Sequence, residues 1–147
     1  MDHCLEVQLP FLQYSKKNQF KIVPIVMIMQ DRVTASELGE AIADSTRALN
    51  SLLIASSDFT HYEPNNEAHR KDSELIDAIL SLDISIFYAT LERLNVSACG
   101  YGAIASIMTA AKALGATKGE LLRYATSGDI VGDNSNNVVG YASIIFT

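Results

Sequence analysis

Two apolar runs on either side of one amphipathic segment constrain the fold of this chain more than any other feature. Residues 20–29 form a near-continuous run rich in Ile and Val, typical of a strand buried on both faces of a mainly parallel sheet. Because proline cannot donate a hydrogen bond to the sheet, this strand is expected either to lie at the edge of the sheet or to have Pro24 near its start. A helix is predicted from about residue 34 to 49, and residues 51–56 form the next strand. Strand, helix and strand with short connections predict a βαβ unit.

The rest of the chain continues the alternation of helices and strands. We expect a single domain over residues 1–147, of the α/β class, with three layers and a mainly parallel or mixed sheet flanked by helices. Asp83 is predicted to cap a short helix, and Gly115 to end a later one. The helices are predicted at 5–14 (interrupted by Pro10), 65–82, 83–93 and 103–114, and the last strands at 121–125 and 138–146.

Composition and charge exclude several classes of protein. Hydrophobic residues make up 48% of the 147 and charged residues 19%, which is typical of a globular domain. The net charge is -6 and the basic residues are scattered, so no nucleic-acid partner is expected. No apolar run approaches the ~20 residues that span a bilayer, and no signal peptide is visible, so a cytoplasmic protein without a membrane partner is expected. Cys4 and Cys99 are distant in sequence and predict reduced thiols.

The stretch 56–61, Ser-Ser-Asp-Phe-Thr-His, is the strongest candidate for a functional site. An apolar run leads directly into small hydroxyls, a carboxylate and an imidazole. Ligands of open α/β proteins bind beyond the carboxyl ends of strands, so Asp58 and His61 are predicted to face a cleft. The alternative is that Ser57 and Asp58 cap the next helix and that His61 lies on a solvated turn.

Three other stretches carry candidate ligand-binding residues. Cys99 and Gly100 directly precede a predicted helix, whose N-terminus favours anions and activates a thiol; alternatively Cys99 is a small buried apolar residue. His3 and Glu6 lie at a predicted helix start, or on an exposed N-terminus. Ser127 and Asp129 belong to a loop, residues 126–134, that suits phosphates, carboxylates or metals but also ordinary hairpin turns.

Four ordered motifs resemble the Memo-like proteins, also called AmmeMemoRadiSam system protein B. They are residues 2–12 (DHCLEVQLPFL), 56–62 (SSDFTHY), Cys99-Gly100 and 124–129 (YATSGD), and the tail from 138 to 144 continues the match. The resemblance implies a fold similar to class III extradiol dioxygenases, which are non-haem iron enzymes. It also implies that Asp58, His61 and Cys99 line a cleft. His3 belongs to a motif usually written Glu-His-Ser, here Asp-His-Cys, and is expected in the same cleft.

The chain begins where the family is about half complete, so its fold is expected to be truncated at the N-terminus. Two histidines of the family's N-terminal half are absent, and the implied metal site is therefore incomplete. A truncated sheet should also expose an apolar edge. Three accounts follow: a half-length subunit that forms a homo-oligomer or pairs with a separate N-terminal half, a truncated gene product, or a gene start assigned too late.

The leading functional hypothesis is a dioxygenase-related cleft that holds a redox metal, iron or copper. His61 would act as general acid/base or metal ligand, Asp58 would orient it, and Cys99 would supply a soft ligand or reactive thiol. The alternative is a non-enzymatic module that binds a peptide or a small molecule, or an inactive half-domain. Whether the chain is an enzyme stays open at this stage.

Overall fold

The computed structural model describes residues 4–16, 19–132 and 137–147. Within them the sheet has three strands: β1 (His61–Glu63), β2 (Gly119–Thr126) and β3 (Val138–Phe146). β3 lies in the centre and pairs antiparallel with both neighbours, and Tyr124 lies opposite Ala142 in the register with β2. The protein is therefore a mixed α/β protein, and the prediction of a mainly parallel sheet is wrong.

The two apolar runs that suggested parallel strands are extended but form no strand. Residues 20–29 and 51–57 make no backbone-to-backbone hydrogen bond within the described part of the chain. Many of their side chains are open to solvent, including Val23 (87% exposed) and Ile28 (94%). The pattern indicates strand propensity, but a strand also needs a neighbour that shares its ladder of hydrogen bonds. The described residues supply none, so no βαβ unit forms.

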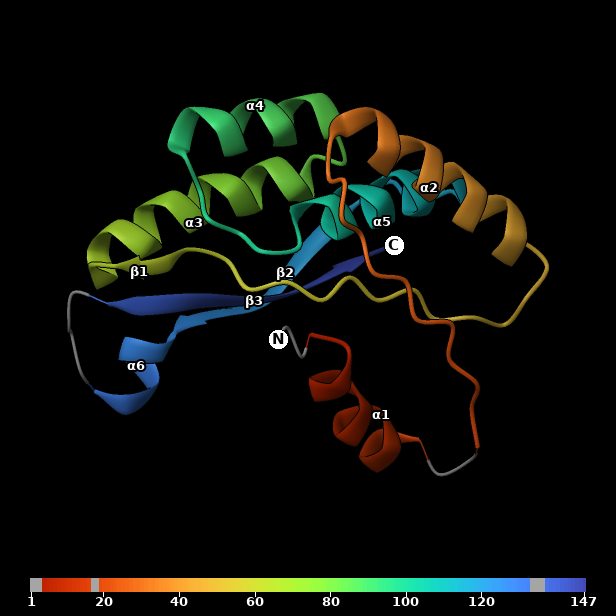
Figure 1. Ribbon diagram of the computed structural model, residues 1–147, viewed down its shortest axis with the longest axis horizontal. Helices are drawn as coiled ribbons and strands as arrows, with labels where there is room; N and C mark the ends of the chain where they lie inside the picture. The colour runs from red at the N-terminus through yellow and green to blue at the C-terminus, as the bar shows by residue number, and fades with distance from the viewer. Residues whose placement is uncertain (1–3, 17–18, 133–136) are drawn as a thin grey trace.

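Four helices lie on one side of the sheet (Figure 1). They are α2 (Arg32–Thr46), α3 (Asn65–Leu80), α4 (Ile84–Leu94) and α5 (Tyr101–Ala113). Each matches a sequence-based prediction within a few residues. α2 packs closely on α5, where a Cβ at Gly39 would meet the Ser106 carbonyl oxygen at 2.5 Å. Leu49, where the predicted helix was expected to end, instead lies beyond the end of α2 and is 64% exposed.

Short polar side chains set the ends of these helices. Asp83 caps α4 as predicted, accepting hydrogen bonds from the amides of Ser85 and Ile86. Asp31 caps α2 in the same way, and its side chain accepts hydrogen bonds from the amides of residues 33 and 34. These bonds satisfy amides that have no partner inside a helix. Gly115 follows α5 with a φ of 105°, as expected for the residue after a helix end.

The N-terminal helix and the segment after β2 are short. The 3-10 helix η1 (Glu6–Gln8) leads into α1 (Leu9–Ser15), and Pro10 stands in the first turn of α1, where a missing N–H costs nothing. Of the predicted loop 126–134, residues 127–131 form the helix α6 (Ser127–Val131), and residues 133–136 lie outside the described part of the chain. Thr126 and Asp129 form a reciprocal capping box that starts α6.

A buried carboxylate joins α3, the residues before β1, and β2. Asp72 on α3 is fully buried and accepts hydrogen bonds from the Thr60 amide (3.1 Å), the Thr60 hydroxyl (2.6 Å) and the Tyr124 hydroxyl (2.7 Å). Burial raises the pKa of Asp72 above its ordinary value despite these donors. A Cβ at Gly140 would collide with Asp72 Oδ2, so β3 can approach only with glycine at this position. Thr60, which Asp72 holds, directly precedes His61.

Candidate functional site

Asp58, His61 and Cys99 come together at one site, as the sequence predicted. One potential ligand atom from each residue lies within 4.8 Å of the others. Asp58 lies in the loop before β1, His61 is the first residue of β1, and Cys99 lies in the turn before α5. His61 Nε2 lies 3.6 Å from Asp58 Oδ2. A carboxylate, an imidazole and a thiol therefore share one small volume.

Ser97 fixes the orientation of His61 through two hydrogen bonds. The His61 amide donates to Ser97 Oγ (2.8 Å), and His61 Nδ1 lies 2.8 Å from the Ser97 carbonyl oxygen. A carbonyl oxygen can only accept, so Nδ1 must carry the proton in this bond. In the neutral ring the lone pair is then on Nε2, which faces Asp58. The imidazole is thus oriented with its basic nitrogen toward the cluster.

A local irregularity in β1 accompanies this orientation. The register between β1 and β3 shifts between His61 and Glu63, and Tyr62 has a φ of 58° in the left-handed region. Such conformations are unfavourable for residues other than glycine and occur where a bulge turns a side chain away from regular pairing. Tyr62 itself is 73% exposed, so little packing depends on it. The irregularity thus lies directly after His61, whose ring is held by Ser97.

The Cys99–Gly100 turn is held against the loop that carries Asp58. The Asp58 amide donates to Cys99 Sγ (3.2 Å), which fixes the thiol beside the carboxylate. Ser57 Oγ accepts a hydrogen bond from the Gly100 amide (2.8 Å) and donates one to the Asp58 carbonyl (2.7 Å). A Cβ at Gly100 would lie 2.6 Å from the Ser56 carbonyl oxygen. Only glycine allows this approach of the two segments.

The side chain of Gln30 also binds the Cys99–Gly100 turn, through two hydrogen bonds. Its Oε1 accepts a hydrogen bond from the Gly102 amide (2.8 Å), and its Nε2 donates to the Cys99 carbonyl (3.0 Å). Tyr88 donates to the Gln30 carbonyl (2.7 Å), and burial raises the pKa of Tyr88 to about 12. Sequence analysis missed Gln30, Ser97 and Asp72. Gln30 was signalled only as a polar residue at the end of an apolar run, and Ser97 only as a hydroxyl two positions before Cys99. Asp72 had no such signal.

Of the other predicted ligand-binding residues that the structure describes, Glu6, Ser127 and Asp129 do not join the cluster. Asp129 accepts hydrogen bonds from Asn65 (3.0 Å) and the Thr126 amide (2.9 Å) and lies 2.9 Å from His69 Nε2, and these contacts lower its pKa to about 2. Ser127 Oγ accepts from the Val139 amide. Glu6 lies exposed on η1, whose last residue, Gln8, donates to Ser56 Oγ (3.0 Å). His3 lies outside the described residues. Among the described members of the predicted ligand-binding group, Gly100 alone adjoins the cluster.

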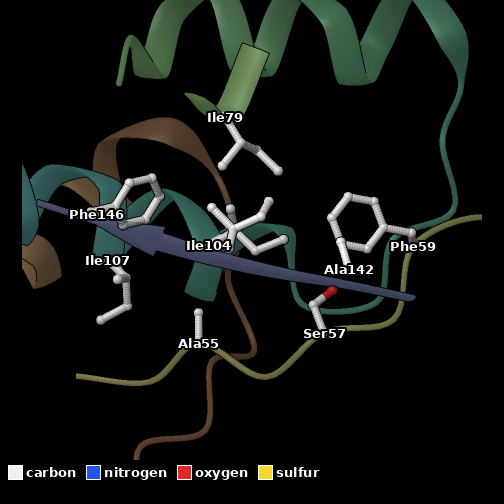
Figure 2. A pocket seen from close by; sticks show the side chains of 9 residues that line it. Ala55, Ser57, Phe59, Ile79, Ile104, Ile107, Ala142 and Phe146 are labelled. Atoms are coloured by element: carbon white, nitrogen blue, oxygen red, sulfur yellow. The ribbon is translucent and has the colours of Figure 1, made fainter. Parts of the chain in front are cut away.

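An apolar cavity is lined in part by Ser57 and Phe59, the two residues that flank Asp58 in the sequence (Figure 2). It has a volume of about 80 Å³ and opens between the segment with Ala55 and Ser57 and the strand with Ala142. Ile79 and Ile104 from the helices also line it. Backbone hydrogen bonds join the loop to β3 at Phe59 and Thr60, but not at residues 51–57 within the described chain. The cavity therefore marks where residues 51–57 separate from β3.

The cluster fits a transition metal by the chemistry of its donors. Thiolate and imidazole are ligands for iron, copper and zinc, and a carboxylate is a common additional ligand. In tetrahedral coordination, ligand atoms at ~2.0–2.3 Å from the ion lie roughly 3.3–3.8 Å from one another. The His61–Asp58 separation already matches, and the 4.8 Å limit for the whole set requires only small rotations of side chains. Three protein ligands would leave one coordination position open.

Fold and site together define a mixed α/β protein with an Asp/His/Cys cluster at the junction of a strand and a helix. The family model described as Memo-like protein matches residues 1–145. This chain belongs to the Memo-like family.

Curated relatives agree over nearly the whole chain. A MEMO1 family protein of Nitrosopumilus maritimus is 52% identical over 145 residues, covering 99% of this chain and 52% of the relative. A MEMO1 family protein of Methanopyrus kandleri is also 52% identical, with the same coverage, and one of Methanosarcina mazei is 53% identical over 146 residues, or 54% of its own length. The chain thus spans about half the length of the curated relatives it matches. No helix among the described residues is long and apolar enough to cross a membrane.

Proposed function

We propose that Asp58, His61 and Cys99 bind a redox-active transition metal ion, iron or copper, at a centre with an open coordination position. The observation that carries the proposal is the convergence of three different donor types within 4.8 Å, with the His61 ring already oriented by Ser97. Metal-binding histidines commonly donate their second ring N–H to a carbonyl in this way.

Each residue has a distinct part in the proposed centre. Cys99 provides the soft ligand that favours iron or copper over calcium or magnesium. His61 provides Nε2 as a ligand or as the group that accepts and releases a proton at the site. Asp58 completes the donor set and lies where it can hold a protonated His61. The bound ion would supply redox or Lewis-acid chemistry to a small ligand.

We also propose an activity for the metal centre. The centre would serve a dioxygenase-like oxidoreductase with a small-molecule substrate, in agreement with the fold that the sequence resemblance implies. We further propose that the protein acts in the cytoplasm, a reducing compartment in which the Cys99 thiol would stay available to a metal.

Metal titration of matched variants tests the proposal. We would load the purified protein with Fe(II) or Cu(I) under anaerobic conditions, in separate experiments, and measure stoichiometry by mass spectrometry and affinity by competition with a chelator. Cys99→Ala and His61→Ala should each weaken the affinity by tenfold or more, because each removes a direct ligand. Asp58→Asn should weaken it less, because an amide oxygen can still coordinate.

Two other residues of the chain provide controls. Cys4→Ala removes the other thiol, and His69→Ala removes an imidazole that pairs with Asp129 outside the cluster. Both variants should bind metal as the unchanged protein does. Circular dichroism of every variant would show whether the fold is kept. Equal affinity in the Cys99→Ala and Cys4→Ala proteins, or binding of a peptide by a protein that takes up no metal, would overturn the proposal.

A further inference from the structure

Thr60 lies between the two cluster residues Asp58 and His61, and three of its atoms are held by hydrogen bonds. Its amide and its hydroxyl both donate to Asp72 Oδ1, at 3.1 and 2.6 Å. Its carbonyl oxygen accepts a hydrogen bond from the Gly140 amide (2.9 Å). Thr60 is fully buried, so water does not compete for these groups. The backbone between Asp58 and His61 can therefore move only if these bonds break.

Asp72 ties this backbone to an element that does not itself carry the cluster. The amides of Asp58 and His61 donate to Cys99 Sγ (3.2 Å) and Ser97 Oγ (2.8 Å), and both acceptors lie in the segment before α5. These two bonds fix the two segments relative to each other, but they would allow both to shift together. Asp72 lies on α3, whose buried face belongs to the hydrophobic core. It therefore provides a fixed reference outside both segments.

The surroundings of Asp72 hold its carboxyl group in one orientation. The group is fully buried, and burial raises its pKa, which reflects the cost of placing a charge there. The Tyr124 hydroxyl donates to Oδ2 (2.7 Å) and leaves Oδ1 to the two donors of Thr60. Gly140 leaves the space that Oδ2 occupies, because a Cβ there would collide with it. An apolar side chain would avoid the cost of burial, but it could not hold Thr60.

We infer that Asp72 is a positioning residue of the cluster, which acts through Thr60 to fix how Asp58 and His61 are placed against Cys99. Asp72 is not itself a ligand in this inference. The inference deepens the proposed metal centre and rests on it only for the purpose of the placement, because the hydrogen bonds themselves need no metal. Groups that orient metal ligands commonly determine the affinity of a site without touching the ion.

Two substitutions of Thr60 separate the effect of its hydroxyl from that of its methyl group. Replacing Asp72 would leave two buried donors unpaired and endanger the fold, so Thr60 is the better position to change. Thr60→Val removes the hydroxyl bond at nearly constant size, whereas Thr60→Ser keeps the bond and removes the methyl group. In metal-free protein with a chelator, hydrogen exchange at the amides of Asp58 and His61 should be at least tenfold faster in Thr60→Val. In Thr60→Ser it should stay within threefold of the unchanged protein.

A second threonine provides the matched control. Thr109→Val makes the same chemical change on α5, where the Thr109 hydroxyl donates to the Ala105 carbonyl of its own helix (3.0 Å). This variant should leave exchange at the amides of Asp58 and His61 unchanged, and circular dichroism would show whether each variant is folded. The metal titration then measures the consequence for the proposed centre. Thr60→Val should weaken the affinity for Fe(II) or Cu(I) by fivefold or more, and Thr60→Ser should restore it to within twofold.

Three results would overturn the inference. The first is unchanged exchange at His61 in Thr60→Val. The second is an equal acceleration in Thr60→Val and Thr60→Ser, which a general loss of stability would produce. The third is faster exchange in Thr60→Val with an unchanged metal affinity. If the unchanged protein takes up no metal, the proposed metal centre fails, while exchange at Asp58 and His61 still decides whether Asp72 positions them, so the two failures are distinguishable.

Discussion

His61 Nδ1 lies 2.8 Å from the carbonyl oxygen of Ser97, and this contact determines which nitrogen of the ring is available to the cluster. The neutral imidazole should therefore exist as the Nδ1-protonated tautomer in the metal-free protein. Two-bond ¹H–¹⁵N correlation spectra, recorded at a pH where the ring is neutral, report the tautomer directly. An Nε2-protonated ring would contradict the orientation described here, because it would direct an N–H rather than a lone pair toward Asp58.

Gly100→Ala should destabilise the protein and weaken metal binding together. The added Cβ would meet the Ser56 carbonyl oxygen at 2.6 Å and Ser57 Cβ at 2.9 Å, so the Cys99 turn must move. Overpacking of this kind costs about 1–3 kcal/mol in the free energy of unfolding. Chemical denaturation and metal titration would measure the two effects.

Gly115→Ala is the control for that experiment. Its φ of 105° makes alanine strained, but a Cβ there meets nothing within 4 Å. A left-handed conformation costs about 1–2 kcal/mol, so the variant should lose similar stability while keeping its metal affinity. Equal affinities in both variants would show that the turn before α5 does not position a ligand.

The stability contributed by the site of Asp72 should fall as pH rises. Burial raises the pKa of Asp72 above 3.8, so over a window that starts near pH 3.8 the folded protein holds a proton that the unfolded chain releases. Stability is therefore lost as pH rises through this window and levels off above the folded pKa. Asp72→Asn cannot ionise and should remove this dependence, as urea midpoints from pH 4 to 7 would reveal.

Asp77→Asn on the exposed face of the same helix is the matched control for Asp72. It removes one carboxylate of α3 without touching the buried network, and its urea midpoints should follow those of the unchanged protein. An unaltered pH slope in the Asp72→Asn protein would show that the carboxyl of Asp72 does not titrate differently on folding.

The stability contributed by Asp129 should depend on pH with the opposite sign, and rise as pH rises. Asn65, the Thr126 amide and His69 lower its pKa to about 2, from 3.8. The stabilisation is thus fully present above pH 3.8 and is lost as pH falls toward 2. Asp129→Asn should have a lower melting temperature than the unchanged protein at pH 5 and converge with it near pH 2. Parallel melting curves across this range would exclude a role for the ionised carboxylate.

The sequence predicted elements whose causes are local. Asp83 begins the helix α4 and Gly115 follows the end of α5, each through contacts within a few residues, and both predictions are confirmed. The meeting of Asp58, His61 and Cys99 was also predicted, although the parallel sheet assumed for it was wrong. That expectation came from the family resemblance, which implied that the three residues line one cleft, and it did not need the run before Asp58 to be a paired strand.

The features that sequence analysis missed depend on contacts distant in sequence. Nothing near Asp72 indicates that it, rather than its exposed neighbour Asp77, would be buried against Tyr124. Strand pairing of residues 20–29 failed for a similar reason, since β-propensity reflects burial against a partner as much as the residue itself. The orientation of His61 by Ser97 likewise required the turn before α5 to be placed next to β1.

Gln30 ends one extended segment and binds the turn that carries Cys99 through two hydrogen bonds. Any partner that orders residues 20–29 would therefore also restrict the motion of the sulfur atom. Thermodynamic linkage then requires reciprocity: a partner that raises the affinity of the cluster for metal has its own affinity raised by the same factor when metal is bound. Gln30 would be the residue that couples residues 20–29 to the cluster.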